Sequence, residues 1–158
     1  MRGYATKLVE LTEQHSERIA RQWAKDVKTN TKTTSYHEAS EEQILWQAAD
    51  FYRNFRQMFF HENPFEFALN YFERYAEDRY REGIPLHEAI YALILMRRHI
   101  WLYAEFQAIF ITAIEHRQAV ESLSRTILMF DYAMYIITWK YQALMKKDIS
   151  VREIGKSR

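Results

Sequence analysis

The strongest constraint on the fold comes from residues 83–111, a long stretch that is apolar on nearly every helical face. Gly83 can end a preceding helix, and Pro85 stands where a new helix begins without losing an N–H that it needs. A helix that is apolar all round is surrounded by other helices rather than lying on a surface. The sequence therefore predicts an all-α helical bundle with this helix at its centre.

Three polar side chains, Arg97, Arg98 and His99, interrupt this apolar stretch. At about 100° per residue, Arg97 falls near the middle of an otherwise apolar stripe. A cation in such a place needs a partner, and Asp131 lies between two apolar faces of a later helix. We therefore expect Asp131 to pair with Arg97 or Arg98, an arrangement that more often fixes helix register than binds a ligand.

A second interpretation leaves one of these arginines free to bind the carboxylate or phosphate group of a ligand. The ligand would then lie in a pocket lined by the aromatic side chains of Trp46, Tyr91 and Trp101. The two arginines, Asp131 and these three aromatic residues are therefore the candidates for ligand binding or for coupling between helices.

Further helices are predicted, from apolar residues at steps of three and four, over 5–27, 41–60, 64–82 and 117–147, with a polar connection at 28–39. Ser40 and Gln43 form a capping box, in which each side chain accepts a hydrogen bond from the other residue's N–H. Asn63 is the expected N-cap and Pro64 the first residue of the next helix. A break is expected near 112–116. The sequence thus predicts a bundle of four to five helices.

The last of these helices, over 117–147, has two apolar faces and therefore packs against two neighbours. The first face contains Leu123, Ile127, Phe130, Met134, Ile137 and Tyr141, and the second contains Leu128, Tyr132, Tyr135 and Trp139. We interpret the second face as the contact with another copy of the chain in a homodimer; a larger core within one chain is the alternative. Residues 1–147 are expected to form a single domain, followed by a basic tail, or linker to an output domain, over 148–158.

Composition narrows the class of protein. The 158 residues, 48% of them hydrophobic, suffice for one domain with a substantial core, and the net charge of +1 gives no general attraction to nucleic acid. The first ten residues lack the apolar core of a secretory signal. The longest uncharged stretch, 106–114, is far shorter than the roughly 20 residues that span a bilayer. We therefore expect a cytoplasmic protein without a membrane span.

The sequence contains no motif of a known catalytic or metal site. It has no cysteine, none of its six histidines has Glu three residues before it, and no two histidines lie four residues apart. Three scattered glycines cannot form a phosphate-binding loop. A lone helical histidine such as His99 is far more often structural than a haem ligand. We expect no catalytic residues, no metal and no cofactor.

Four segments resemble a known family: IARQW at 19–23, GIPLHEA at 83–89, LMRRHIW at 95–101 and ESLSRTILMFDYA at 121–133. Together, over about 12–145, they resemble the helical N-terminal sensor domain of bacterial RsbR-type stress-response co-antagonists, a domain also found ahead of sensor histidine kinases. The resemblance implies a non-enzymatic, all-helical and often dimeric input module, which can be globin-like without haem. An output domain normally follows this module, and none follows it within this chain.

Pattern and resemblance together predict a non-catalytic cytoplasmic sensory or regulatory domain of a bacterial signalling protein. We expect a homodimer that forms through the first and last helices and sends its signal along the last helix. A ligand or partner near Arg97 and Asp131 would shift the packing of the helix over 83–111 against the last one. The alternative is a ligand-free protein-interaction or dimerisation module.

Overall fold

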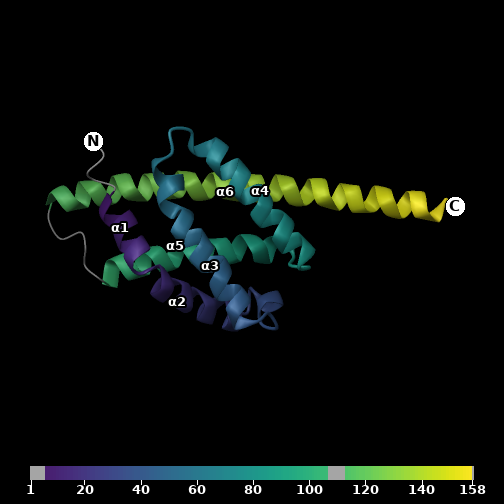
Figure 1. Cartoon of the computed structure of the whole chain (residues 1–158), viewed down its shortest axis with the longest axis horizontal. Coiled ribbons are helices and arrows are strands. Elements are labelled where there is room, and N and C mark those ends of the chain that lie inside the picture. The colour runs from purple at the N-terminus through teal and green to yellow at the C-terminus, as the bar shows by residue number, and fades with distance from the viewer. Residues whose placement is uncertain (1–5, 107–112, 158) are drawn as a thin grey trace.

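The computed structural model of the chain describes residues 6–106 and 113–157, and these residues form an all-α bundle (Figure 1). The elements are α1 (Thr6–Gln14), α2 (Ser16–Thr29), the short 3₁₀ helix η1 (Thr34–Tyr36), α3 (Glu41–Phe60), α4 (Pro64–Arg81), α5 (Leu86–Phe106) and α6 (Ala113–Lys156). The predicted all-α fold is confirmed, and no strand occurs in the described ranges.

The starts of α3 and α4 are set by the predicted capping residues. The Ser40 hydroxyl accepts a hydrogen bond from the Gln43 N–H at 3.2 Å, and the Asn63 side chain accepts one from the Glu66 N–H at 3.3 Å. The Gln43 side chain donates to the Glu82 carboxylate at 2.9 Å and ties α3 to the end of α4. Among the described residues it accepts no bond from the Ser40 N–H, so only one half of the predicted capping box is formed. Local sequence thus determines where both helices begin.

The junction between α4 and α5 depends on Gly83, whose φ of +76° lies in the left-handed region that glycine adopts without strain. The Ile84 N–H donates to the Arg79 carbonyl at 3.1 Å, and the Gly83 N–H donates to the Tyr80 carbonyl at 3.0 Å. This pair of bonds is a Schellman motif, which satisfies carbonyls at a helix end. The chain then turns directly into α5.

The central position predicted for the helix over 83–111 is confirmed for α5. Its buried residues include Ala89, Ala92, Leu93, Leu95, Met96, Ile100 and Ala104. Two aromatic donors from other helices bond to its carbonyls: Trp23 Nε1 on α2 reaches Ala92 at 2.9 Å, and the Tyr52 hydroxyl on α3 reaches Met96 at 3.1 Å. α6 runs beside α5 in the opposite direction (Figure 1).

Some predicted boundaries are wrong. The helix expected over 5–27 is divided at His15 into α1 and α2. The connection expected to be polar at 28–39 contributes Thr33 and Tyr36 to the core. α6 begins at Ala113, inside the break expected near 112–116, and residues 107–112 lie outside the described ranges.

The largest difference is in the last helix, which was expected to end near 147 but continues to Lys156. Most of the predicted basic tail is therefore helical. No helix in the described part of the chain combines the length and the apolar character needed to cross a membrane.

Candidate functional site

The arginine in the middle of the α5 stripe meets α6, but its contact there is not the predicted one. The Arg97 guanidinium lies over the Phe130 ring, 5.8 Å from the ring centroid, which is a cation–π geometry. Asp131, the next residue, is exposed and forms no hydrogen bond or ion pair with any residue that the structure describes. The predicted pairing of Asp131 with Arg97 or Arg98 is therefore wrong, because the helix turns Phe130 rather than Asp131 toward α5.

The three aromatic residues expected to line one pocket lie in separate places. Trp46 is on α3 and 60% exposed. Tyr91 and Trp101 are both on α5, where ten residues correspond to about 15 Å along the axis, and the Lys32 ammonium lies 5.3 Å from the Tyr91 ring centroid. The structure does not bring these three rings together around Arg97.

His99, the third polar residue of the stretch, forms a contact that sequence reasoning did not anticipate. Its Nε2 lies 2.8 Å from an Asp26 carboxylate oxygen on α2. Only 12% of the His99 side chain is exposed, so the pair joins α2 to α5 at a partly buried position. This contact gives His99 a structural role, that of linking α2 to α5.

An apolar face on α6, interrupted by a few polar residues, is exposed to solvent, and we call it the α6 face. Its apolar members, each 39–64% exposed, are Val120, Leu123, Ile127, Leu128, Tyr135, Trp139, Met145 and Ile149. At about 100° per residue, all of them fall within roughly one half of the helix circumference. From the first to the last member the face is about 44 Å long, at about 1.5 Å per residue. Asp131, Thr138 and Gln142 lie within it.

The α6 face contains most of the predicted dimer contact. Leu128, Tyr135 and Trp139 are exposed, whereas Tyr132 is half-buried and packs edge-on against the Phe65 ring at 5.3 Å. The other predicted face is only partly correct. Phe130, Ile137 and Tyr141 are buried, but Leu123 and Ile127 are exposed, because Ser122 and Thr126 face the bundle there instead.

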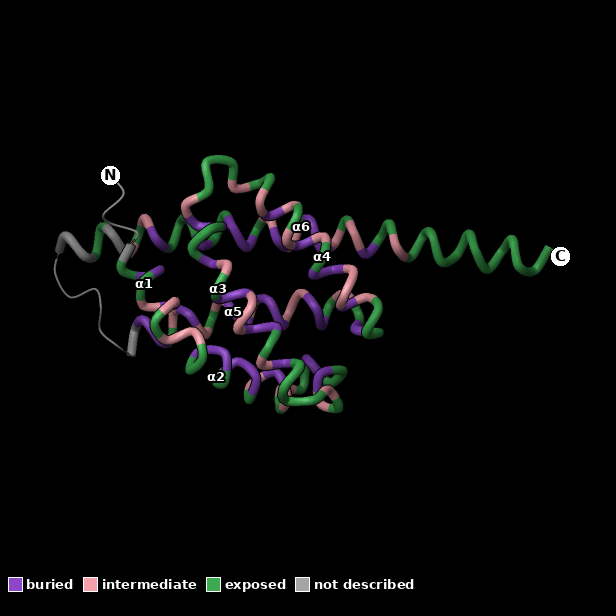
Figure 2. The backbone as a smooth tube through the Cα atoms, in the orientation of Figure 1, coloured by how far each residue is buried: buried purple, intermediate pink, exposed green. Residues whose placement is uncertain are grey.

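Beyond Tyr141, α6 extends past the other helices (Figure 1), and Figure 2 shows this part almost entirely exposed. The Tyr80 hydroxyl donates a hydrogen bond to the Asp148 carboxylate, which joins the end of α4 to the projecting part of α6. Val151 and Ile154, which continue the side of α6 that faces the bundle, are 62% and 63% exposed. Both sides of the projecting helix therefore carry uncovered apolar residues.

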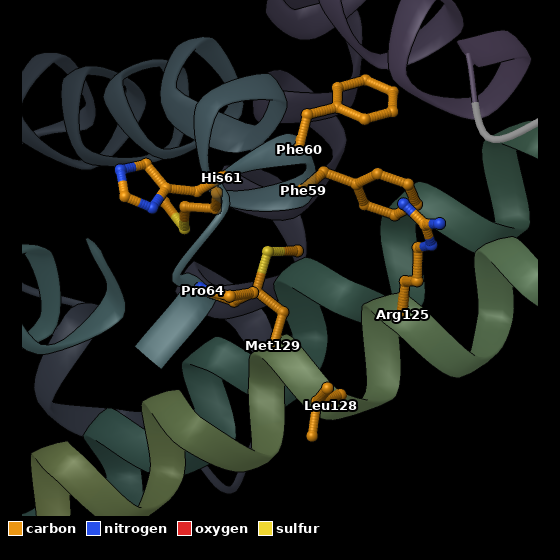
Figure 3. Close-up of a pocket in the computed structure, with 8 residues that line it drawn as sticks. Phe59, Phe60, His61, Pro64, Arg125, Leu128 and Met129 are labelled. Carbon is orange, nitrogen blue, oxygen red and sulfur yellow. The ribbon is translucent and has the colours of Figure 1, made fainter. Parts of the chain in front are cut away.

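A groove of about 430 Å³ lies beside the α6 face, where the end of α3 and the start of α4 meet α6 (Figure 3). Met58, Phe59, Phe60 and Met129 supply apolar walls. Figure 3 shows Arg125 rising from α6 toward Phe59, with 5.9 Å between guanidinium and ring, whereas Leu128 points away from the other side chains. Leu128 thus belongs to both the groove and the exposed face.

The contact of α4 with α6, the most extensive in the bundle, includes ion pairs. Lys140 Nζ on α6 lies 2.8 Å from a Glu77 oxygen and 4.0 Å from a Glu73 oxygen. The hydrogen bond from Lys140 lowers the pKa of Glu77. The Glu77 side chain is 42% exposed and the Lys140 side chain 20%, so solvent screens this ion pair and it adds little to stability.

A buried arginine on α4 was missed by sequence reasoning. Arg79 is 4% exposed, and its guanidinium donates to the two Glu82 oxygens at 2.7 and 2.9 Å. Burial opposes the charge, but Tyr75 and Glu82 outweigh it and raise the pKa of Arg79. Burial also raises the pKa of the Tyr75 hydroxyl. The spacing of Arg79 three residues before Glu82 was the only sequence signal for this pair.

No group of three or more His, Asp or Glu side chains suited to a metal ion occurs among the residues described. Comparisons of the chain with models of protein families, with curated proteins and with solved structures found no match. The resemblance to the RsbR-type sensor domain therefore remains a hypothesis based on the four sequence segments.

Proposed function

We propose that this chain is a non-catalytic regulatory input module, which forms a homodimer and passes changes in the bundle along α6 to an output domain or partner protein. The observation that supports this most is the α6 face, because exposed apolar residues over about 44 Å of one helix are unusual on a monomer's surface. A second copy of the same face would cover them in a symmetric, self-complementary contact.

The projecting part of α6 supplies a route for the signal. α6 joins the bundle from Ser122 to Tyr141 and continues as the same helix to Lys156. A shift of α6 against the bundle would therefore move its far end directly. We place the origin of such a shift at the contact between α5 and α6 where Arg97 lies over Phe130.

This coupling can be tested with two neighbouring arginines. Arg97→Met keeps the aliphatic stem and removes the cation over Phe130, and we expect it to change the dissociation constant of the dimer. Arg98→Met removes an exposed cation and serves as the matched control. Equal dissociation constants for both variants and the unchanged chain would contradict coupling through Arg97.

The groove beside Leu128 favours a second candidate function, a ligand-free interaction module. Its apolar walls are suited to a side chain from a partner protein. Native mass spectrometry of the purified chain separates the two candidates. A dimer with a bound small molecule supports the input module, and a dimer without one favours the interaction module. A monomer alone would contradict the assignment of the α6 face as a dimer contact.

A further inference from the structure

A second cavity, of about 240 Å³, lies between α3 and α4 on a different part of the bundle from the α6 face. Its volume is below the roughly 300 Å³ at which pockets for drug-sized ligands begin. A metabolite with few non-hydrogen atoms is therefore the largest occupant that it suits. The cavity shares no lining residue with the groove beside Leu128.

Two buried polar side chains that line this cavity lack hydrogen-bond partners among the residues described. Gln47 is 5% exposed, and its carboxamide forms no hydrogen bond there. Tyr75 is 7% exposed, and its hydroxyl meets no partner at full hydrogen-bond geometry, although the Tyr36 hydroxyl and the Arg79 guanidinium both lie close to it. Buried polar groups in native proteins nearly always have a partner. The unpartnered Gln47 oxygen therefore indicates a polar occupant of the cavity.

The charges around the cavity restrict the occupant further. Arg74 and Arg79 carry two positive charges, and Asp50 and Asp78 carry two negative charges, so the lining has no net charge. Arg79 is held by Glu82, and Asp50 accepts a hydrogen bond from the Tyr71 hydroxyl at 2.9 Å. These two are already engaged, which leaves Arg74 and Asp78 for a ligand.

Arg74 and Asp78 are the less engaged pair. Within the described ranges the exposed Arg74 guanidinium makes no hydrogen bond or ion pair, and Asp78 has only a loose contact with Arg81 at 3.7 Å. The two residues are four apart on α4, so they lie on one side of that helix. The cavity thus combines an available cation, an available carboxylate and an unpaired carboxamide oxygen, that of Gln47.

We propose that this cavity binds a free α-amino acid in its zwitterionic form. The Arg74 guanidinium would bind the carboxylate, because its fork of N–H groups matches two oxygens. The Asp78 carboxylate would accept from the ammonium group. Gln47 and Tyr75 would complete the hydrogen bonds of the ligand, and the exposed Trp46 ring would cover its side chain. The site does not depend on dimer formation.

Thermal unfolding of the chain with each of the twenty L-amino acids tests the proposal. We expect at least one to raise the unfolding temperature, since a ligand that binds only the folded state stabilises it. The N-acetyl amide of that amino acid lacks both charges and should have no effect. The proposal is overturned if none of the twenty raises the temperature, or if the uncharged analogue acts equally well.

Two variants test the assigned roles. Arg74→Gln removes no contact from the free protein and should raise the dissociation constant at least about tenfold, as expected for a lost hydrogen bond to a charged group. Arg53→Gln, at an exposed arginine of α3 outside the cavity, is the matched control and should bind as the unchanged chain does. Equal binding by Arg74→Gln and the control would refute the role of Arg74.

Gln47→Leu tests whether the buried Gln47 side chain binds the amino acid or a buried water molecule. It removes the unpaired buried carboxamide, so the free protein should unfold at a higher temperature while the amino acid no longer stabilises it. A lower unfolding temperature with unchanged amino-acid binding would show that Gln47 serves bound water and not the ligand. Either readout is independent of the dimer contact on α6.

Discussion

Tyr135→Ala is the sharpest perturbation of the proposed dimer, because Tyr135 is 63% exposed in the middle of the α6 face. An aromatic side chain buries about 150–250 Å² when fully covered, so roughly 100–160 Å² of Tyr135 remains to be covered by a partner. At about 25 cal/mol per Å², full coverage is worth about 2.5–4 kcal/mol. An interface rarely covers the whole side chain, so we take about 2 kcal/mol per copy.

A symmetric dimer contains this residue twice, so the variant should lose about 4 kcal/mol of association free energy, or about 10³-fold in dissociation constant. Sedimentation equilibrium over a range of concentrations measures this constant directly. The folded monomer should keep its unfolding free energy within about 0.5 kcal/mol, as expected for an exposed position.

Trp46→Ala is the matched control for this measurement, since Trp46 is an aromatic residue on α3 with a similar exposed fraction of 60%. Its removal should leave the dissociation constant unchanged. The reasoning is refuted if Tyr135→Ala associates as tightly as the unchanged chain, or if the control weakens association by the same factor.

Three further predictions concern charged residues. Asp131→Asn should leave the unfolding free energy of the monomer unchanged, because Asp131 has no partner among the described residues. It should tighten the dimer in sedimentation by removing a carboxylate from the α6 face, and a less stable monomer would contradict this reasoning. Arg79→Met removes two charge-assisted hydrogen bonds to Glu82, while the Glu82 carboxylate can be rehydrated. The variant should therefore lower the unfolding free energy by about 2–3 kcal/mol in denaturant titrations, and an unchanged unfolding free energy would contradict this. Lys140 holds the pKa of Glu77 below its ordinary value of 4.5, so its contribution to stability is present above pH 4.5 and is lost as the pH falls through the lowered value. Glu77→Gln should therefore reduce the acid sensitivity of unfolding slightly, and an unchanged pH profile would refute this link.

Helix starts were the most predictable part of the fold, because local chemistry decides them. Ser40, Asn63 and Pro64 cap or open their helices through groups within three residues, and Gly83 supplies the backbone conformation that ends α4. The break at His15 has no such signal, since neither glycine nor proline is present there.

Partners across helices were harder to predict, because a stripe of residues does not show which neighbour it meets. Arg97 was correctly placed at the contact with α6, but that helix presents Phe130 instead of Asp131, a difference of about 100° around its axis. The same difference brings Ser122 and Thr126 into the core in place of Leu123 and Ile127. Apolar periodicity alone would bury Leu123 and Ile127 rather than Ser122 and Thr126.

The length of α6 was underestimated because the cations after Trp139 suggested a solvated helix end. Residues such as Leu144, Met145, Lys146 and Lys147 are strong helix formers, so the helix has no local reason to stop before Gly155. The stability of the part of α6 that projects beyond the bundle then depends on whether a second copy of the chain or a partner protein covers it.

Hydrogen exchange in residues 142–156 of α6 tests the central claim most directly. This segment lies almost entirely in solvent, and an isolated helix of about 12–15 residues is only marginally stable in water. If a second copy covers the α6 face, amides in this segment should exchange slowly at concentrations where the chain is dimeric, and faster on dilution. Fast exchange at every concentration, with the bundle still protected, would contradict the account.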